Sequence, residues 1–291
     1  MRRSEDLDVC RILFYLGLFI WFLPDRFEAY AYVPHELYLP PPLTRWLGFP
    51  APAMPWILIA RVAWLGSLLL SSAGLLTRLS TWTAFLLGLY LLSLDWSYGN
   101  TAHTRHLVVL CLGVMAFTRC SQHFSLDAWL ARRLGLASAR AAPQDESWGL
   151  RLCQLCWCLM FFNAGLSKLR NGGLDFLSGS NFQYILLVTQ EWYARDLNPL
   201  SAELRQAVLG NQALATLLSV AGLLAELSAP LALFVSGRWR LLIVGSNALL
   251  QIGAYLLFYI VEFRKMSPTY LFWVPWSYLF QRLKARNRPE E

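Results

Sequence analysis

Residues 214–235 read LATLLSVAGLLAELSAPLALFV, a run in which Glu226 is the one charged side chain. A run of about twenty apolar residues is long enough to cross the hydrocarbon core of a bilayer as a helix. Apolar and polar positions do not alternate along it, so the pattern does not indicate a half-buried strand. The stretch predicts a membrane-spanning helix with a carboxyl group near the middle of the bilayer.

The whole chain shares this apolar character. Of its 291 residues, 56% are hydrophobic and 15% are charged, and the mean hydropathy is +0.41. A soluble domain typically has about 45–50% apolar and about 25% charged residues. This composition excludes disordered, collagen-like and disulfide-scaffold proteins. The net charge of +7 lies in short loops and leaves no basic face, so it indicates membrane topology and not a nucleic-acid partner.

Further apolar runs predict an all-α polytopic membrane bundle with about 7–8 transmembrane helices. They lie at residues 9–23, 56–76, 79–94, 106–117, 148–168 and 241–263, and a proline-broken aromatic segment at 268–280 is the eighth. We expect one membrane domain over residues 1–291, with a core at 9–263 followed by the aromatic segment and a basic tail at 264–291. The lipid bilayer is its first expected partner.

The distribution of Lys and Arg predicts the orientation of the chain. With both ends cytoplasmic, fourteen basic residues fall on the cytoplasmic side and nine on the opposite side. Cytoplasmic loops carry the excess of basic residues, so this count favours a cytoplasmic N-terminus. The first apolar run lacks a small-residue cleavage pattern and is expected to be retained. The expected location is the bacterial inner membrane, or the endoplasmic reticulum membrane in a eukaryote.

The long loops and the cysteines lead to three further expectations. Residues 25–55, rich in proline and aromatic side chains, predict an ordered interfacial loop. Residues 124–134 predict an amphipathic helix on the membrane surface, capped by Ser125 and then Asp127. The cysteines are expected to be packed thiols without a structural disulfide, and they lie at positions 10, 111, 120, 153, 156 and 158.

Ionisable side chains within or beside the spans are the first candidates for a functional site. A charge at the centre of a bilayer costs at least about 2.5–3.5 kcal/mol on insertion scales, so such residues are rarely incidental. In the predicted topology they share the outer half of the membrane, which indicates a polar pocket opening away from the cytoplasm. They are Arg61, Asp95, His103, Arg105, His106, Lys168 and Glu226.

Structural alternatives stay open for these residues. Glu226 can be a protonated acid bonded to a neighbouring helix, or the ion-pair partner of Arg61. Lys168 can extend its ammonium group to the interface as an anchor. His103 and His106 lack a nearby carboxylate or thiol ligand and make a weak metal site, so no metal is predicted.

Several motifs resemble those of a known family. The segment Phe161–Leu169 reads FFNAGLSKL and resembles the aromatic-x-x-Ala-Gly-x-x-Lys-Leu signature of the horizontally transferred transmembrane (HTTM) domain family, which includes the vitamin K-dependent gamma-carboxylase. The Ser125–Asp127 motif, the Glu226–Ala229 stretch ELSA and the turn Gly74–Ser80 are similar to further family motifs, in the same order. The resemblance covers roughly residues 9–263.

The resemblance implies chemistry that composition alone does not. In the carboxylase, the lysine of the signature is the base that starts oxygenation of a reduced naphthoquinone, and Lys168 occupies that position. An unprotonated lysine near pH 7 requires a desolvated pocket. The family's later histidine is absent here, and Gln251 is its expected replacement, able to hydrogen-bond a quinone carbonyl but not to exchange a proton. His103 lies one residue from the slot of the family's other histidine.

The sequence therefore predicts a lysine-dependent, quinone-linked oxidoreductase or carboxylase-like protein acting on a small molecule or peptide from the non-cytoplasmic side. Lys168 is the predicted base, with Glu226 and Arg61 as its electrostatic neighbours. His103, Gln251 and Asp95 are predicted to bind the cofactor, a reduced quinone of the menaquinone or vitamin K type. The rival hypothesis is a non-catalytic membrane scaffold or a lipid- or small-molecule-binding maturation factor, which the absent histidine favours. A transporter ranks third, because no inverted repeat is present.

Overall fold

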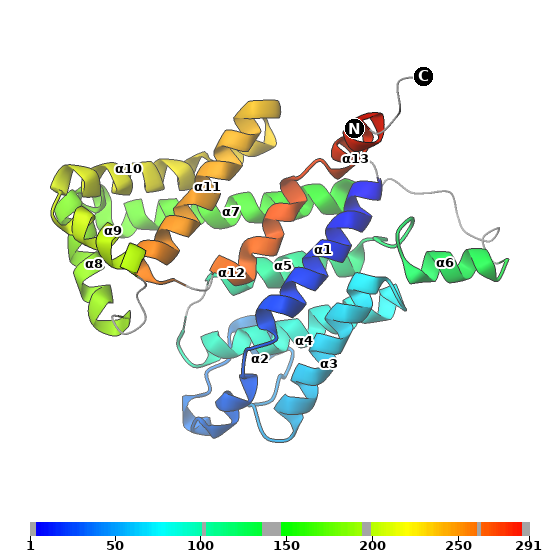
Figure 1. The fold of residues 1–291 in the computed structure, drawn as a ribbon. Coiled ribbons are helices and arrows are strands. Elements are labelled where there is room, and N and C mark those ends of the chain that lie inside the picture. Colours follow the sequence, from blue (N-terminus) through cyan, green and yellow to red (C-terminus); the bar gives the residue numbers. More distant parts are fainter. Residues whose placement is uncertain (1–3, 101–102, 136–146, 194–198, 261–262, 287–291) are drawn as a thin grey trace. The chain divides into compact units, whose positions relative to one another are not determined.

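The computed structural model describes residues 4–100, 103–135, 147–193, 199–260 and 263–286, and within these ranges the regular structure is helical (Figure 1). The α-helices are α1 (Ser4–Phe22), α2 (Pro42–Trp46), α3 (Trp56–Ala73), α4 (Thr77–Ser97), α5 (His103–Phe117), α6 (Leu126–Arg133), α7 (Ser147–Gly172), α8 (Gly179–Tyr193), α9 (Pro199–Leu209), α10 (Gln212–Ser228), α11 (Gly237–Phe258), α12 (Phe263–Met266) and α13 (Trp276–Arg286). The 3-10 helices are η1 (Phe27–Tyr32), η2 (His35–Leu37), η4 (Gly173–Leu177), η6 (Ala229–Leu233) and η7 (Ser267–Trp273).

The expectation of an all-α chain is therefore confirmed over the described ranges. The expectation of a membrane protein is supported only by the length and apolar character of some helices. Four described segments are long and apolar enough to cross a membrane: Trp56–Ala73, Ser147–Leu177, Gln212–Leu233 and Gly237–Phe258. These helices are consistent with an integral membrane protein. The count of seven or eight spans, the type of membrane and the orientation of the N-terminus stay predictions.

The remaining expected spans form helices that are shorter or more polar than a standard span. Helix α1 carries Glu5, Asp6, Asp8 and Arg11 within its 19 residues. Helix α4 has 21 residues, but serine and threonine side chains dilute its apolar character. The apolar part of α5 is short, Thr104–Phe117. The expected eighth segment is broken into η7 and α13, because Pro275, between the two helices, lacks the amide hydrogen that a continuous helix needs.

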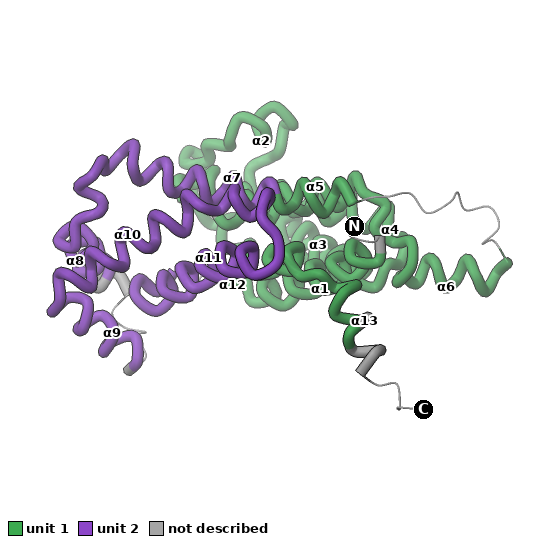
Figure 2. Tube along the Cα trace, turned by 90° about the horizontal axis from the view of Figure 1, so that it is seen from above, with its two compact units in different colours: residues 1–154, 264–291 green, residues 155–263 purple. Residues whose placement is uncertain are grey.

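The chain divides into two compact units, which Figure 2 distinguishes by colour. Unit 1 comprises residues 1–154 and 264–291. Its helix α3 packs against α1 and α4, α5 packs against α4, and η7 packs along α1. Buried aromatic rings fill the contacts: Trp64 lies edge-on to Phe22 and Phe27, and its indole nitrogen donates a 2.9 Å hydrogen bond to the carbonyl of Ala84.

Unit 2 comprises residues 155–263, which include the larger part of α7. In this unit α10 packs against α8 and α11, and α9 packs against α10 and α11. Leu186, Val208, Ala215 and Leu257 form a buried cluster with one side chain from each of α8, α9, α10 and α11. This packing fixes the position of α10, which carries Glu226.

The segments between the predicted spans contain the ordered structure expected at 25–55 and a helix within 124–134, while their positions at a membrane surface stay predictions and one expected cap is wrong. The loop at 25–55 contains η1, η2 and α2, and α6 forms within the predicted surface-helix region. The Ser125 hydroxyl accepts a hydrogen bond from the amide of Ala128 and so caps α6. The second expected cap is wrong, because the Asp127 carboxylate accepts hydrogen bonds from the amides of Leu76 and Thr77 and caps α4 instead.

All six cysteines are thiols, five of them buried and Cys156 half-buried. One of them bridges two elements of unit 2: the Cys158 thiol donates a 3.2 Å hydrogen bond to the carbonyl of Ala229. The expectation of packed thiols therefore agrees with the structure.

Candidate functional site

The strongest candidate site lies in unit 2, where α7 and α10 bring Lys168 and Glu226 together. The Lys168 ammonium group donates a hydrogen bond to Glu226 Oε1 and forms an ion pair with it. The side chain of Glu226 is 6% exposed, whereas that of Lys168 is 35% exposed. The carboxylate is thus held inside the unit, and the amine is the end of the pair that a ligand can reach.

The second carboxylate oxygen is the most informative atom of this site. Glu226 Oε2 is buried and accepts no hydrogen bond from any described residue. A buried carboxylate oxygen without a donor is costly, because desolvation is not offset by a hydrogen bond. The carboxylate is therefore short of one donor, and a hydroxyl is a group of the kind that would satisfy it.

A glycine allows the two helices to approach each other beside this pair. A Cβ atom at Gly165 would lie 3.0 Å from Leu227 Cδ2 and 3.1 Å from Glu226 Cβ. Small residues at such contacts let helix backbones pack closely in membrane proteins. Gly165 lies three residues before Lys168, so both face α10. The Ala-Gly-x-x-Lys and Glu-Leu motifs thus meet at one contact.

An aromatic ring and a buried amide complete the surroundings of the pair. The Phe176 ring centroid is 5.7 Å from the Lys168 nitrogen, a distance at which a ring attracts a cation. The Ser219 hydroxyl donates a 2.7 Å hydrogen bond to the Phe176 carbonyl and so ties η4 to α10. The Asn247 amide, fully buried on α11, donates a 2.8 Å hydrogen bond to the carbonyl of Ala225.

Asn247 was not among the residues predicted for the site, although a polar side chain within the apolar run at 241–263 was a usable signal. Its Oδ1 atom is a second buried acceptor without a donor in the described part of the chain. Gln251, which was predicted to bind the cofactor, follows it by one helical turn and shares its face of α11. Gln251 is half-buried.

The other predicted residues lie in unit 1 and have other partners. Arg61 forms an ion pair with Glu28 at 3.1 Å and donates a 2.8 Å hydrogen bond to the carbonyl of Leu23. The alternative pair of Arg61 with Glu226 is therefore replaced by two separate pairs, Arg61 with Glu28 and Lys168 with Glu226. These separate pairs give no support to Arg61 as the electrostatic neighbour of Lys168.

The two remaining predicted cofactor ligands also belong to unit 1. Asp95 is buried at the end of α4 and pairs with Arg105 at 2.7 Å. His103 is the first residue of α5, and its side chain lies outside the described part of the structure.

A further group of resemblance motifs meets in unit 1 and has a structural role. Arg11 is completely buried and donates hydrogen bonds to the carbonyls of Cys120, Ser71, Ser72 and Phe124. Gly74 ends α3 with a φ of +70°, and a Cβ there would meet the Ser125 side chain. These contacts hold α1, the α3–α4 turn and the segment before α6 together.

Comparison with known proteins returned no family model, no curated protein and no solved structure that matches this chain.

Proposed function

We propose that this chain is a membrane protein in which Lys168 and Glu226 perform lysine-dependent proton transfer to or from a reduced quinone. The reaction class is a quinone-linked oxidoreductase or carboxylase-like activity on a small molecule or peptide. The observation that carries the proposal is the pair itself, a partly exposed amine bonded to a buried carboxylate whose second oxygen lacks a donor. The quinone comes from the resemblance to the HTTM family.

The pair provides a way to present an unprotonated amine in an apolar setting. An ion pair and a neutral acid–amine pair have the same net charge and differ only in which group holds the shared proton. Separated charges raise the free energy of the ion pair away from water, so the free-energy difference between the ion pair and the neutral pair becomes smaller. Transfer of the proton to Glu226 would leave a lone pair on Lys168, the form that a general base requires.

The residues present also fit a quinol as the ligand. A quinol hydroxyl is a donor and would satisfy Glu226 Oε2, and the amide groups of Asn247 and Gln251 can hydrogen-bond ring oxygens. The half-buried Phe176 ring offers an apolar surface beside the amine. When bound, the quinol supplies reducing equivalents, while the protein orients it and holds or moves the proton at Lys168 Nζ.

The rival function is a non-catalytic scaffold or small-molecule-binding protein in which the same contact is a structural ion pair. The specific observation in its favour is that the Lys168 ammonium group is already engaged by Glu226, which neutralises it. In that case the pair holds α7 against α10, and its loss changes stability without changing any chemistry.

Quinol turnover by detergent-purified protein distinguishes the two functions. Reduced menaquinone or vitamin K is supplied with oxygen and bicarbonate, and oxidised and epoxidised products are separated by chromatography. Wild type is compared with Lys168→Ala and Lys168→Arg, and Lys284→Arg serves as a matched lysine control. We expect turnover by wild type and by the control.

We expect no turnover by Lys168→Arg, because a guanidinium group does not release its proton near neutral pH. Retained turnover by a well-folded Lys168→Arg protein would refute the proposal. Absence of turnover by well-folded wild type with several quinones would support the scaffold function.

A further inference from the structure

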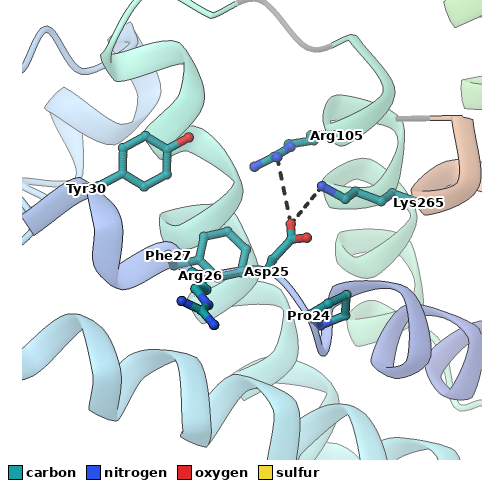
Figure 3. A pocket seen from close by; sticks show the side chains of 7 residues that line it. All are labelled: Pro24, Asp25, Arg26, Phe27, Tyr30, Arg105 and Lys265. Carbon is teal, nitrogen blue, oxygen red and sulfur yellow. Dashed lines mark ion pairs between the residues drawn. The ribbon is translucent and has the colours of Figure 1, made fainter. Parts of the chain in front are cut away.

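A polar cavity lies in unit 1, formed by three segments that are distant in sequence. Its volume is about 370 Å³, which is within the size range of pockets for small ligands. Residues 24–30, at and after the end of α1, form one side, and Arg105 on α5 and Lys265 on α12 form the other (Figure 3). Arg26, Phe27 and Tyr30 are also among the lining residues.

Two cations converge on one carboxylate oxygen in this cavity. The Lys265 nitrogen is 2.8 Å from Asp25 Oδ2, and a guanidinium nitrogen of Arg105 is 3.9 Å from the same oxygen. A separation of 3.9 Å exceeds a hydrogen bond, so Arg105 and Asp25 form an ion pair without a hydrogen bond, while the other guanidinium nitrogen of Arg105 pairs with Asp95 at 2.7 Å. Figure 3 shows both cations directed at Asp25, with the rings of Phe27 and Tyr30 to the other side of it.

The charges around the cavity leave an excess of one positive charge. The cavity is lined by the cations Arg26, Arg105 and Lys265 and by one carboxylate, Asp25, and a second carboxylate, Asp95, pairs with Arg105. The Arg26 side chain is exposed to solvent, and its guanidinium group has no hydrogen-bond or ion-pair partner among the described residues.

The neighbouring tyrosines do not add negative charge. The Tyr30 ring stacks on that of Tyr98 with a centroid distance of 5.4 Å. Burial raises the pKa of Tyr98 above its usual value, so its hydroxyl remains neutral at physiological pH. The aromatic side of the cavity is therefore an uncharged surface.

We propose that this cavity binds a monoanionic oxygen group, a carboxylate or a phosphodiester, whose apolar portion rests against Phe27 and Tyr30. Arg105 presents a planar fork of donors that matches such a group, and Lys265 adds a compact charge. The proposal does not depend on Lys168 or on the quinone chemistry, because all of its residues belong to unit 1.

Asp25 then acts as an internal competitor for the ligand. Its carboxylate pairs with Arg105 and Lys265 when the cavity holds no anion. An incoming anion must share these two cations with Asp25 or displace Asp25 from them. Removing the Lys265 charge should weaken anion binding, and removing the Asp25 charge should strengthen it. These opposite effects are a signature that a merely structural ion-pair cluster does not produce.

The test measures binding of benzoate, a carboxylate on an aromatic ring, to detergent-purified protein by equilibrium dialysis. Benzamide is the uncharged control for benzoate. In parallel, protein in nanodiscs is offered phosphatidylglycerol, a monoanionic phosphodiester lipid, or net-neutral phosphatidylcholine, and retained lipid is counted by native mass spectrometry. The variants are Lys265→Gln, Asp25→Asn and the matched control Lys284→Gln.

We expect Lys265→Gln to weaken binding about tenfold and Asp25→Asn to strengthen it by a similar factor, as for the loss or gain of one charged contact. This pattern with benzoate identifies a soluble carboxylate, and the pattern with phosphatidylglycerol alone identifies a lipid headgroup. Equal affinities among wild type, Lys265→Gln and Asp25→Asn would overturn the proposal, as would equal binding of benzoate and benzamide. If Lys265→Gln does not fold, the single variants Asp25→Asn and Lys265→Arg are used. Asp25→Asn should strengthen binding and Lys265→Arg, which keeps the positive charge, should retain it, and equal affinities of Asp25→Asn and wild type would overturn the proposal.

Discussion

The unequal burial of Lys168 and Glu226 predicts that the two single variants differ in stability. In Lys168→Met, the Glu226 carboxylate remains 6% exposed and loses the one partner that its described surroundings provide. Removing one member of a buried pair costs about 3–5 kcal/mol. In Glu226→Gln, the amide oxygen still accepts from Lys168, whose partly exposed ammonium group can also turn to water. We expect a cost of about 1 kcal/mol there, near the range of exposed pairs.

The expected difference is about 2 kcal/mol or more, which corresponds to roughly a thirtyfold change in the folding equilibrium. Equilibrium unfolding in mixed micelles, followed by circular dichroism, measures it for both variants. The double variant Lys168→Met with Glu226→Met should cost less than the sum, because apolar replacement of both partners of a buried pair is often neutral. Glu28→Gln, at the ion pair of unit 1, is the control and should cost about 1 kcal/mol, because the glutamine oxygen still accepts a hydrogen bond from Arg61.

Equal destabilisation by Glu226→Gln and Lys168→Met would contradict the expected difference. That result would mean that the lysine charge, and not the carboxylate, is the group that the fold shields from water. The amine would then be unavailable to a ligand, and the proposed base would lose its structural support.

Further predictions concern the contacts that hold unit 1 together. Asp127→Ala should destabilise the protein by about 2 kcal/mol, more than Asp127→Asn, because it removes the cap and the favourable charge at the start of α4. Hydrogen exchange of the α4 amides measures this, and exchange in Asp127→Ala no faster than in Asp127→Asn would contradict it. Gly74→Ala should cost about 1–3 kcal/mol more than Gly48→Ala, since both glycines have a positive φ but only a Cβ at Gly74 would meet Ser125, at 2.4 Å; equal melting temperatures would argue against the close contact. Arg11→Met should cost at least about 3 kcal/mol, because it leaves four buried or partly buried carbonyls without their donor. Equilibrium unfolding measures this, and a curve close to that of wild type would contradict the role of Arg11 in joining these segments.

The charged residues show why the candidate site was only partly predictable. An isolated carboxylate in the run LATLLSVAGLLAELSAPLALFV is improbable without a partner, so the sequence alone singled out Glu226. It did not identify that partner, since Arg61 and Lys168 were both available. Pairing depends on which helices pack together, and α7 and α10 meet at Gly165. Arg61 pairs instead with Glu28, which lies on the short 3-10 helix η1 in the loop at 25–55, outside the apolar runs that predict the spans.

The cavity in unit 1 illustrates the same limit for residues outside the spans. Asp25 and Lys265 flank apolar runs and look like ordinary interfacial charges in the sequence. They are 240 positions apart, and only the packing of η7 along α1 brings the segment of Lys265 to the end of α1. Asp127 is a similar case, because local spacing indicated a cap for its own helix whereas its carboxylate caps α4.

The class of the described chain, all-α with apolar helices long enough to cross a membrane, was predictable from the sequence, because apolar run length and helical hydrogen bonding are local properties. The sequence also determined which charges are too costly to be incidental. The tertiary structure alone decided their partners and their exposure, including the orphan oxygen of Glu226 and the shared oxygen of Asp25. Ion pairs and cavities form between side chains from distant segments, and their geometry follows from helix packing that no local pattern encodes.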